Sequence, residues 1–220
     1  YGSKSANLAE LRTIIPSVSP EGFAIPFYYY HEFMTHNGFY SEVEQMINSE
    51  SFKSFPSVRN RRLKEFRKKI KDTGILPGWM LDELRSMQES FAEGSRLRAR
   101  SSTNNEDLEG FNGAGLYESY THYPNEGHFA KTAKQVWAGL WTYRAFEERD
   151  FWRIDHLTAS MGILVHPSFQ DESANGVGVT KNIYIPGPGW DGHYVNVQKG
   201  ENLVTNPEPG SVAEEYIIAN

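Results

Sequence analysis

Three arginines at alternate positions begin the stretch of this 220-residue chain that is richest in chemically active side chains. Arg96, Arg98 and Arg100 are separated by single apolar residues, so a strand here would place all three guanidinium groups on one face. Like charges side by side on one face repel each other, and an anion is the counterpart that would relieve this repulsion. The spacing therefore predicts anion binding beside a short strand.

Hydroxyl and amide side chains follow the arginines, and they are Ser101, Ser102, Thr103, Asn104 and Asn105. Residues of these types favour turns and leave backbone N–H groups available for a ligand. The strand is therefore expected to end in a turn whose backbone and side chains donate hydrogen bonds.

Glycines and carboxylates complete the stretch. Gly110, Gly113 and Gly115 would let the backbone approach a ligand closely. Carboxylates that suit a hard divalent cation stand at Glu106, Asp107, Glu109 and Glu118. Together these groups suit a magnesium-bound polyphosphate. An arginine-rich edge strand followed by a polar surface turn is the alternative that residue types alone leave open.

Composition limits the class of protein. Hydrophobic residues make up 39% of the chain and the net charge is −6, so a real core is expected, and basic features should be local. The absence of cysteine excludes disulfides, thiolate metal sites and cysteine nucleophiles, and it fits a cytoplasmic protein. No apolar run approaches the ~20 residues of a membrane span. We therefore expect neither a nucleic-acid nor a membrane partner.

The first residues predict a helix. Leu8, Leu11 and Ile15 recur at helical spacing, so we expect them to pack inward. Lys4 lies near the start of this helix, where a cation opposes the helix dipole unless it shares an anion. A phosphate at this helix end and a solvated lysine at a frayed terminus are both compatible with the residues alone.

Further elements follow from periodicity and turn signals. Helices are expected at 27–36, 42–48, 58–71, 77–91 and 127–150, the last as one helix or two, and strands at 119–123, 160–165 and near 194–197. Helix 58–71 is strongly basic, but Leu63, Phe66 and Ile70 form a core-facing stripe. Its charges therefore indicate a solvated face rather than a nucleic-acid or membrane surface.

The central stretch also resembles a known family. The segments Arg100–Ser102, Glu106–Leu108 and Gly113–Ser119 are similar to the nucleotide-binding domain of phosphoenolpyruvate synthases and pyruvate phosphate dikinases. The last segment, Gly-Ala-Gly-Leu-Tyr-Glu-Ser, is also similar to that of the glucan water dikinases. The resemblance runs from Gly2 to about Thr205.

The resemblance implies an α+β fold: an ATP-grasp-like, two-lobed domain with mixed or antiparallel sheets and packed helices. Residues 1–160 would form the N-terminal lobe, with a helical insert at about 40–92, and residues 161–220 a partial second lobe. The phosphohistidine domain and the barrel domain of a dikinase are absent, because 220 residues cannot hold them. The chain thus resembles the ATP-binding half of a longer enzyme.

The resemblance also implies residue roles. Lys4 and Arg100 would be the catalytic residues that contact ATP phosphates, with support from Arg98 and Arg144. The groups expected to cradle phosphate oxygens are Ser101, Ser102 and the turn from Gly113 to Gly115. Mg²⁺ would meet Glu118 or Glu201, and His166 stands near the adenine, where the family usually has glutamine. Ser3 replaces the second glycine of the family's Gly-Gly-Lys segment.

The implied reaction transfers phosphate from ATP to an enzyme histidine and then to an acceptor such as pyruvate. ATP and Mg²⁺ are the expected cofactors, and the phosphohistidine domain of the same parent enzyme is the expected partner. Two alternatives remain open: a nucleotide-binding module without catalysis, and a protein-interaction module that retains only the fold.

Overall fold

The computed structural model describes residues 1–105, 115–183, 192–200 and 212–219. It divides into two compact units, Tyr1–Ser168 and Phe169–Asn220. Helices and antiparallel sheets make up both units together, which confirms the expected α+β class. Strand β4, which begins at Met161, belongs to the first unit.

The first unit is built on a four-stranded antiparallel sheet with the order β1-β4-β2-β3. Its strands are β1 Phe23–Ile25, β2 Leu97–Thr103, β3 Tyr120–His122 and β4 Met161–Pro167. Strands β2 and β4 pair along seven residues, from Leu97 opposite Pro167 to Thr103 opposite Met161. The arginine strand predicted from the sequence is therefore an inner strand of this sheet.

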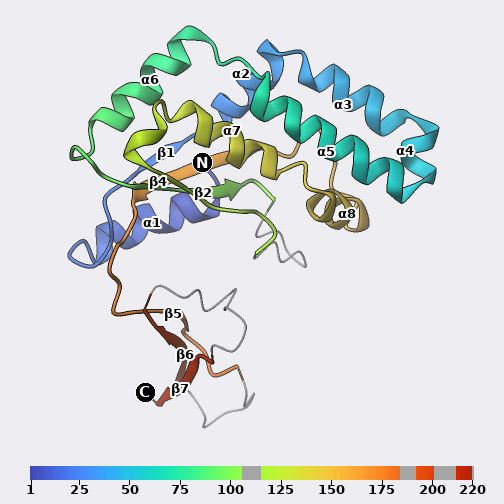
Figure 1. The fold of residues 1–220 in the computed structure, drawn as a ribbon. Helices are drawn as coiled ribbons and strands as arrows, with labels where there is room; N and C mark the ends of the chain where they lie inside the picture. The colour runs from blue at the N-terminus through green and yellow to red at the C-terminus, as the bar shows by residue number, and fades with distance from the viewer. Residues whose placement is uncertain (106–114, 184–191, 201–211, 220) are drawn as a thin grey trace. The chain divides into compact units, whose positions relative to one another are not determined.

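Helices cover both faces of the sheet, with α1 on one face and the other helices gathered beyond the opposite face (Figure 1). The helices are α1 Ser3–Ile14, α2 Phe27–His36, α3 Phe39–Asn48, α4 Glu50–Ser54, α5 Pro56–Asp72, α6 Gly78–Glu89, α7 Ala130–Gly139 and α8 Tyr143–Phe151, with a 3-10 turn at Pro124–Glu126. Segment 127–150 thus forms two helices.

Aromatic side chains fill the space between the sheet and the larger helical layer. Phe33 lies 4.9 Å from Trp137 between ring centroids, and the Trp141 indole donates a hydrogen bond of 3.0 Å to the Tyr30 hydroxyl. These four side chains are fully buried. The aromatic helix at 27–36 is therefore core structure, as its pattern predicted.

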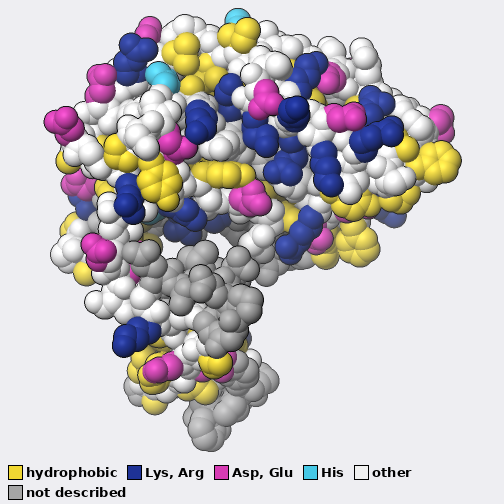
Figure 2. All heavy atoms as spheres, in the orientation of Figure 1, with side chains coloured by type: hydrophobic (Ala, Val, Ile, Leu, Met, Phe, Trp, Pro, Cys, Tyr) yellow, Lys and Arg dark blue, Asp and Glu magenta, His cyan; other side chains and the backbone are white. Residues whose placement is uncertain are grey.

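The basic helix α5 also behaves as predicted. Leu63, Phe66 and Ile70 are buried, whereas lysine and arginine side chains gather on the outer face over α5 (Figure 2). Glu42 pairs with Lys69 and Glu147 with Arg59. The charges are thus a solvated surface laced with ion pairs.

Helix α1 differs from the prediction. Leu11 and Ile15 are exposed, and so is Ile14, while Ser5 is the buried residue of this helix. The expectation that Leu11 and Ile15 pack inward was wrong, because α1 rests on the sheet through its small first-turn residues, whereas Leu8 is half-buried. Gly2 and Ser5 contact Ser102 of β2, and this contact fixes which side of α1 faces the sheet.

The second unit contains an antiparallel sheet with the order β5-β6-β7. Its strands are β5 Ala174–Val179, β6 Gly192–Lys199 and β7 Glu214–Ala219. Strand β6 contains the strand predicted near 194–197. Among the described residues of both units, no helix combines the length and apolar character needed to cross a membrane.

Candidate functional site

Successive side chains of strand β2 point to opposite faces of the sheet, and this divides the predicted site residues between the two faces. Arg98, Arg100 and Ser102 lie on the face that α1 partly covers, whereas Leu97, Ala99, Ser101 and Thr103 are buried toward the helical layer. Arg96 precedes the strand, and its guanidinium lies 5.4 Å from the centroid of the Tyr123 ring. Ser101 and Ser102 therefore point to opposite sides of the sheet.

Positive groups gather on the α1 face of β2. Arg98 donates a hydrogen bond of 2.9 Å to the Thr121 hydroxyl and stands opposite His166 in the pairing with β4. Burial lowers the pKa of Arg98, and the neighbouring charge of Arg100 lowers it further. Burial also lowers the pKa of His166, whose Nδ1 lies 2.8 Å from the Pro167 carbonyl. Arg100 itself is exposed, so its guanidinium is accessible to an anion.

The first turn of α1 docks beside these arginines. The Ser5 backbone N–H donates to Ser102 Oγ at 3.2 Å, and that hydroxyl donates to the Tyr1 carbonyl at 2.8 Å. Gly2 has a φ of 79°, and a Cβ there would lie 2.5 Å from the Ser102 backbone, so only glycine fits. Arg100 precedes Ser102 by two residues, which is roughly 7 Å along a strand.

The start of α1 has the properties of an anion site. Within the described residues, α1 has no side-chain cap and no acidic residue in its first turn, and Lys4 is half-buried there. An uncapped helix N-terminus carries partial positive charge, and a lysine at this end adds to it. Lys4 stands at this helix end and Arg100 on the strand beside it, an arrangement that suits an anion.

Buried polar atoms without hydrogen-bond partners surround the same end of β2. In the described part of the chain they are Ser3 Oγ, Ser5 Oγ, Ser101 Oγ, Thr103 Oγ1, Asn105 Nδ2 and Arg149 Nη2. Buried polar groups in folded proteins are nearly always paired, so such a group of atoms calls for an explanation. A cavity of about 700 Å³ also lies beneath α1, lined in part by Ser5, Leu8 and Leu164.

The predicted metal contact stands apart from these arginines. Glu118 is exposed and accepts a hydrogen bond from Tyr120, whose partner Ala99 faces the helical layer. Burial and this bond raise the pKa of Tyr120 to about 12. Gly113 and Glu201 lie outside the described residues. Among the described residues, no three acidic, histidine or cysteine side chains gather as metal ligands, so these residues do not by themselves form a Mg²⁺ site.

Two other predicted residues can be placed. Gly115 has a φ of 72°, a left-handed conformation that favours glycine. Arg144 is exposed in the first turn of α8, and among the described residues no hydrogen bond or ion pair joins it to β2. The structure therefore places the α1 turn that holds Lys4 against Ser102, and puts Arg98 and Arg100 on the same face of β2 with His166 alongside, whereas Arg144 lies apart.

Sequence reasoning missed a buried polar chain behind β2. Arg149 is fully buried in α8 and donates from Nη1 to the Tyr117 hydroxyl at 3.5 Å, and that hydroxyl donates to Asn105 Oδ1 at 3.3 Å. One signal was available: Arg149 follows Ala145 by four residues, so it falls on the apolar stripe of α8.

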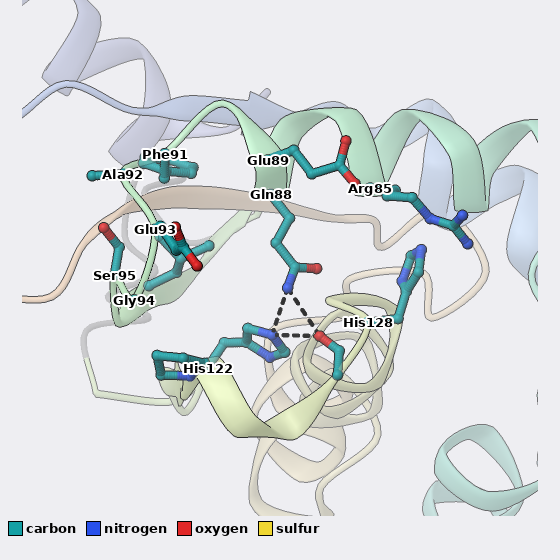
Figure 3. A pocket seen from close by; sticks show the side chains of 13 residues that line it. Arg85, Gln88, Glu89, Phe91, Ala92, Glu93, Gly94, Ser95, His122 and His128 are labelled. Carbon is teal, nitrogen blue, oxygen red and sulfur yellow. Dashed lines mark hydrogen bonds between the residues drawn. The ribbon is translucent and has the colours of Figure 1, made fainter.

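A second cavity of about 700 Å³, also missed, is lined in part by Leu97 and His122 and shares Phe91, Ala92 and Ser95 with the first. Figure 3 shows Gln88 pointing from α6 toward His122. Gln88 donates to the Gly127 carbonyl at 2.9 Å and accepts from the Phe129 N–H at 2.9 Å. His122 Nδ1 lies 2.8 Å from the Thr132 hydroxyl, and Nε2 lies 3.2 Å from the Gly127 carbonyl. These buried groups are fully paired, which is typical of a structural network.

Comparison with known proteins identifies relatives of the chain. A family model described as "Pyruvate phosphate dikinase, AMP/ATP-binding domain" matches residues 1–211. The phosphoenolpyruvate synthase of Aeropyrum pernix is 29% identical over 178 residues, which cover 79% of this chain and 22% of the relative. The phosphoenolpyruvate synthase of Aquifex aeolicus is 26% identical over 188 residues, covering 80% of this chain and 21% of that enzyme. The chain spans about a fifth of the length of these relatives.

Proposed function

Because the chain belongs to the family of pyruvate phosphate dikinase AMP/ATP-binding domains, we propose that it binds ATP as the nucleotide-binding part of a phosphoenolpyruvate synthase- or pyruvate phosphate dikinase-like phosphotransferase. The reaction would transfer phosphate from ATP to a histidine of a phosphohistidine domain in the same parent enzyme. That histidine would then pass the phosphate to an acceptor such as pyruvate.

The observation that carries the proposal is the docking of α1 on Ser102. The Ser5 N–H bond to Ser102 Oγ fixes the uncapped start of α1 beside the arginine face of β2. Phosphoryl transfer depends mainly on positioning and on stabilising negative charge. A helix N-terminus, a lysine and exposed guanidinium groups on one sheet face supply both.

Each residue then has a role that follows from its place. Lys4 and Arg100 contact the phosphates, and Arg98, held by Thr121, adds positive charge from a fixed position. Ser102 positions α1 through its hydroxyl, while Ser101, buried on the other face, contributes through the backbone. In the proposal His166 lies at the adenine side.

Mg²⁺ is proposed to arrive with the nucleotide. Mg²⁺ is usually held by one or two carboxylates together with phosphate oxygens and water. Glu118 and Glu201 remain the candidate carboxylates, together with the turn containing Gly113 and Gly115. When bound, the ion would neutralise charge on the phosphates. Arg144 would act only as distant support, because it lies on the surface of α8.

An equilibrium titration with Mg-ATP tests the proposal. Arg100→Ala should weaken binding by about 10- to 100-fold, because a hydrogen bond to a charged group contributes roughly 1.5–3 kcal/mol. Lys4→Ala should weaken it similarly. Lys64→Ala, which removes an exposed cation from α5, is the control and should leave affinity unchanged. Equal affinities in all four proteins would exclude this phosphate site.

A nucleotide-binding module without catalysis is the second candidate, since the described residues lack a metal-ligand cluster. Incubation of the chain with Mg-ATP and a separately supplied phosphohistidine domain distinguishes the two. Transfer of labelled γ- or β-phosphate to that domain's histidine supports the phosphotransferase. Binding without transfer supports the module.

A further inference from the structure

Arg149 has surroundings unlike those of Arg59, an arginine of the helical layer whose side chain is 13% exposed. Arg59 forms an ion pair with Glu147, at 2.5 Å. Arg149 is completely buried, yet no ion pair with a carboxylate joins it to any described residue. Its Nη2 has no partner, and its guanidinium carbon lies 5.6 Å from the centroid of the Trp141 ring. Burying a charge without an opposite charge is costly, and an apolar side chain would fill the same volume without that cost.

Arg149 makes hydrogen bonds on two sides, and one of them leads toward the turn after β2. Nη1 donates to the Tyr117 hydroxyl, and the hydroxyl hydrogen is then directed to Asn105 Oδ1. On the other side, Nε donates to His156 Nδ1 at 3.4 Å. Burial and the charge of Arg149 lower the pKa of His156 to about 4, so that His156 is neutral at pH 7 and can accept this bond. The guanidinium is thus bonded to His156 on one side and, through Tyr117, linked to Asn105 on the other.

The turn after β2 is tied down by two consecutive asparagines. Asn104 Nδ2 donates to the Thr158 carbonyl at 2.9 Å, and its Oδ1 accepts from the Ser160 N–H at 2.9 Å. Asn105 is tied from the opposite side, through Tyr117. The position of Asn105 therefore depends on Arg149, and residues 106–114, which carry the carboxylates and Gly113 of the nucleotide motif, follow directly in the sequence.

We propose that Arg149 is a positioning residue for the triphosphate end of the nucleotide, acting through Tyr117 and Asn105 on the turn that follows β2. The inference rests on the proposed ATP site and deepens it. Arg149 does not touch the nucleotide. It fixes the backbone at the end of the strand whose arginines do.

Competition titrations with Mg-ATP and with adenosine, on the 220-residue chain, test this role. Tyr117→Phe keeps the ring and removes the hydroxyl link. It should raise the dissociation constant of Mg-ATP about fivefold, as expected for one hydrogen bond, and leave that of adenosine within about twofold. Arg149→Gln should raise the Mg-ATP constant by about tenfold or more.

Arg59→Gln is the matched control, because it removes a well-buried arginine on the α5 side of the helical layer. It should lower the melting temperature and leave the ratio of the two dissociation constants unchanged. If Tyr117→Phe and Arg149→Gln change only the melting temperature, or weaken Mg-ATP and adenosine equally, Arg149 is purely structural and the inference fails. If the unaltered chain binds neither Mg-ATP nor adenosine, the proposed function fails first.

Discussion

The two ends of strand β2 differ in how completely their polar groups are paired. The closed end, formed by Gln88, His122, Gly127 and Thr132 around Leu97, satisfies its buried groups through the hydrogen bonds of Gln88 and His122. The open end, formed by the first turn of α1, residues Ser101–Asn105 and Arg149, leaves six buried polar atoms of the described residues without partners. Both ends belong to the same strand, and the two cavities of about 700 Å³ share Phe91, Ala92 and Ser95 near its start.

The two ends of β2 are therefore distinguished by how completely their buried polar groups are paired, and cavity volume alone does not identify a ligand site in this protein. A fully paired network stabilises the fold and gains nothing from a ligand. Unpaired donors beside positively charged side chains are stabilised when an anion arrives. The closed end is therefore structural and the open end is the proposed nucleotide site, and each measurement below tests this assignment.

The largest expected effect is at Gly2, where α1 docks at the open end. Gly2→Ala would place a Cβ 2.5 Å from the Ser102 backbone at a φ of 79°. It should lower the free energy of unfolding by about 3 kcal/mol and abolish Mg-ATP binding, because α1 cannot stay beside Arg100. Chemical denaturation and titration measure the two effects.

Gly38→Ala is the matched control for this change. Gly38 also has a left-handed φ, of 66°, but a Cβ there would meet nothing within 4 Å. It should cost about 1 kcal/mol of stability from backbone strain and leave Mg-ATP affinity unchanged. Equal losses at Gly2 and Gly38 would contradict the tight docking of α1.

Lowering the pH should reduce the free energy of unfolding, because buried histidines lie at both ends of β2. Burial lowers the pKa of His122 at the closed end and moves that of His156, beside Arg149, from 6.5 to about 4. The unfolded chain then binds protons that the folded chain cannot, so stability is complete above pH 6.5 and falls toward pH 4. The loss should be on the order of 2–3 kcal/mol, mostly from His156. Denaturation between pH 8 and pH 4 measures it.

His156→Gln should remove most of this pH dependence. His36→Gln, which removes an exposed histidine, is the control and should leave the slope in place. Stability that rises as the pH falls below 6.5 would have the wrong sign for buried neutral histidines.

A smaller effect is expected from one bond of the closed end. Thr132→Val keeps the shape of a buried side chain and leaves His122 Nδ1 without its partner. It should lower the free energy of unfolding by about 1–2 kcal/mol and leave Mg-ATP affinity unchanged. A loss of affinity with unchanged stability would mean that the closed end also serves the ligand.

The smallest effect is expected on the surface of the closed end. Lys131 pairs with Glu126 at 2.7 Å beside the 3-10 turn, and its side chain is largely exposed. Because exposed ion pairs are screened by water and salt, Lys131→Ala should change stability by no more than about 0.5 kcal/mol. Thermal unfolding at low and high salt measures it, and a change several times larger would contradict the view that this ion pair is exposed and screened.

Local pattern predicted much of the fold. The aromatic helix at 27–36 and the core stripe of α5 follow from side-chain periodicity, and the structure has both. The inward packing of Leu11 and Ile15 was wrong, because α1 docks through a long-range contact between Gly2 and Ser102 that no local pattern encodes. The periodicity of a single sequence predicts which local elements form, but not which distant residues they pack against.

The candidate site was predicted in part, for the same physical reason. The alternation of side chains along one strand was enough to predict that Arg98 and Arg100 share a face, and the structure has this strand. That Lys4 lies beside them depends on how α1 packs across the sheet. The roles of all three remain predictions. Arg149 was missed because its function depends on Tyr117 and Asn105, which are 32 and 44 residues away in the chain.

Thermal unfolding with and without saturating Mg-ATP is the most direct test of the claim that one end of β2 binds nucleotide and the other end is structural. A ligand at 100 times its dissociation constant adds about 2.7 kcal/mol, which raises the melting temperature by several degrees. We predict that Arg100→Ala keeps the melting temperature of the free chain and loses the increase, whereas Gln88→Ala lowers that temperature and keeps the increase. The opposite pattern, with the increase retained in Arg100→Ala and lost in Gln88→Ala, would contradict the account.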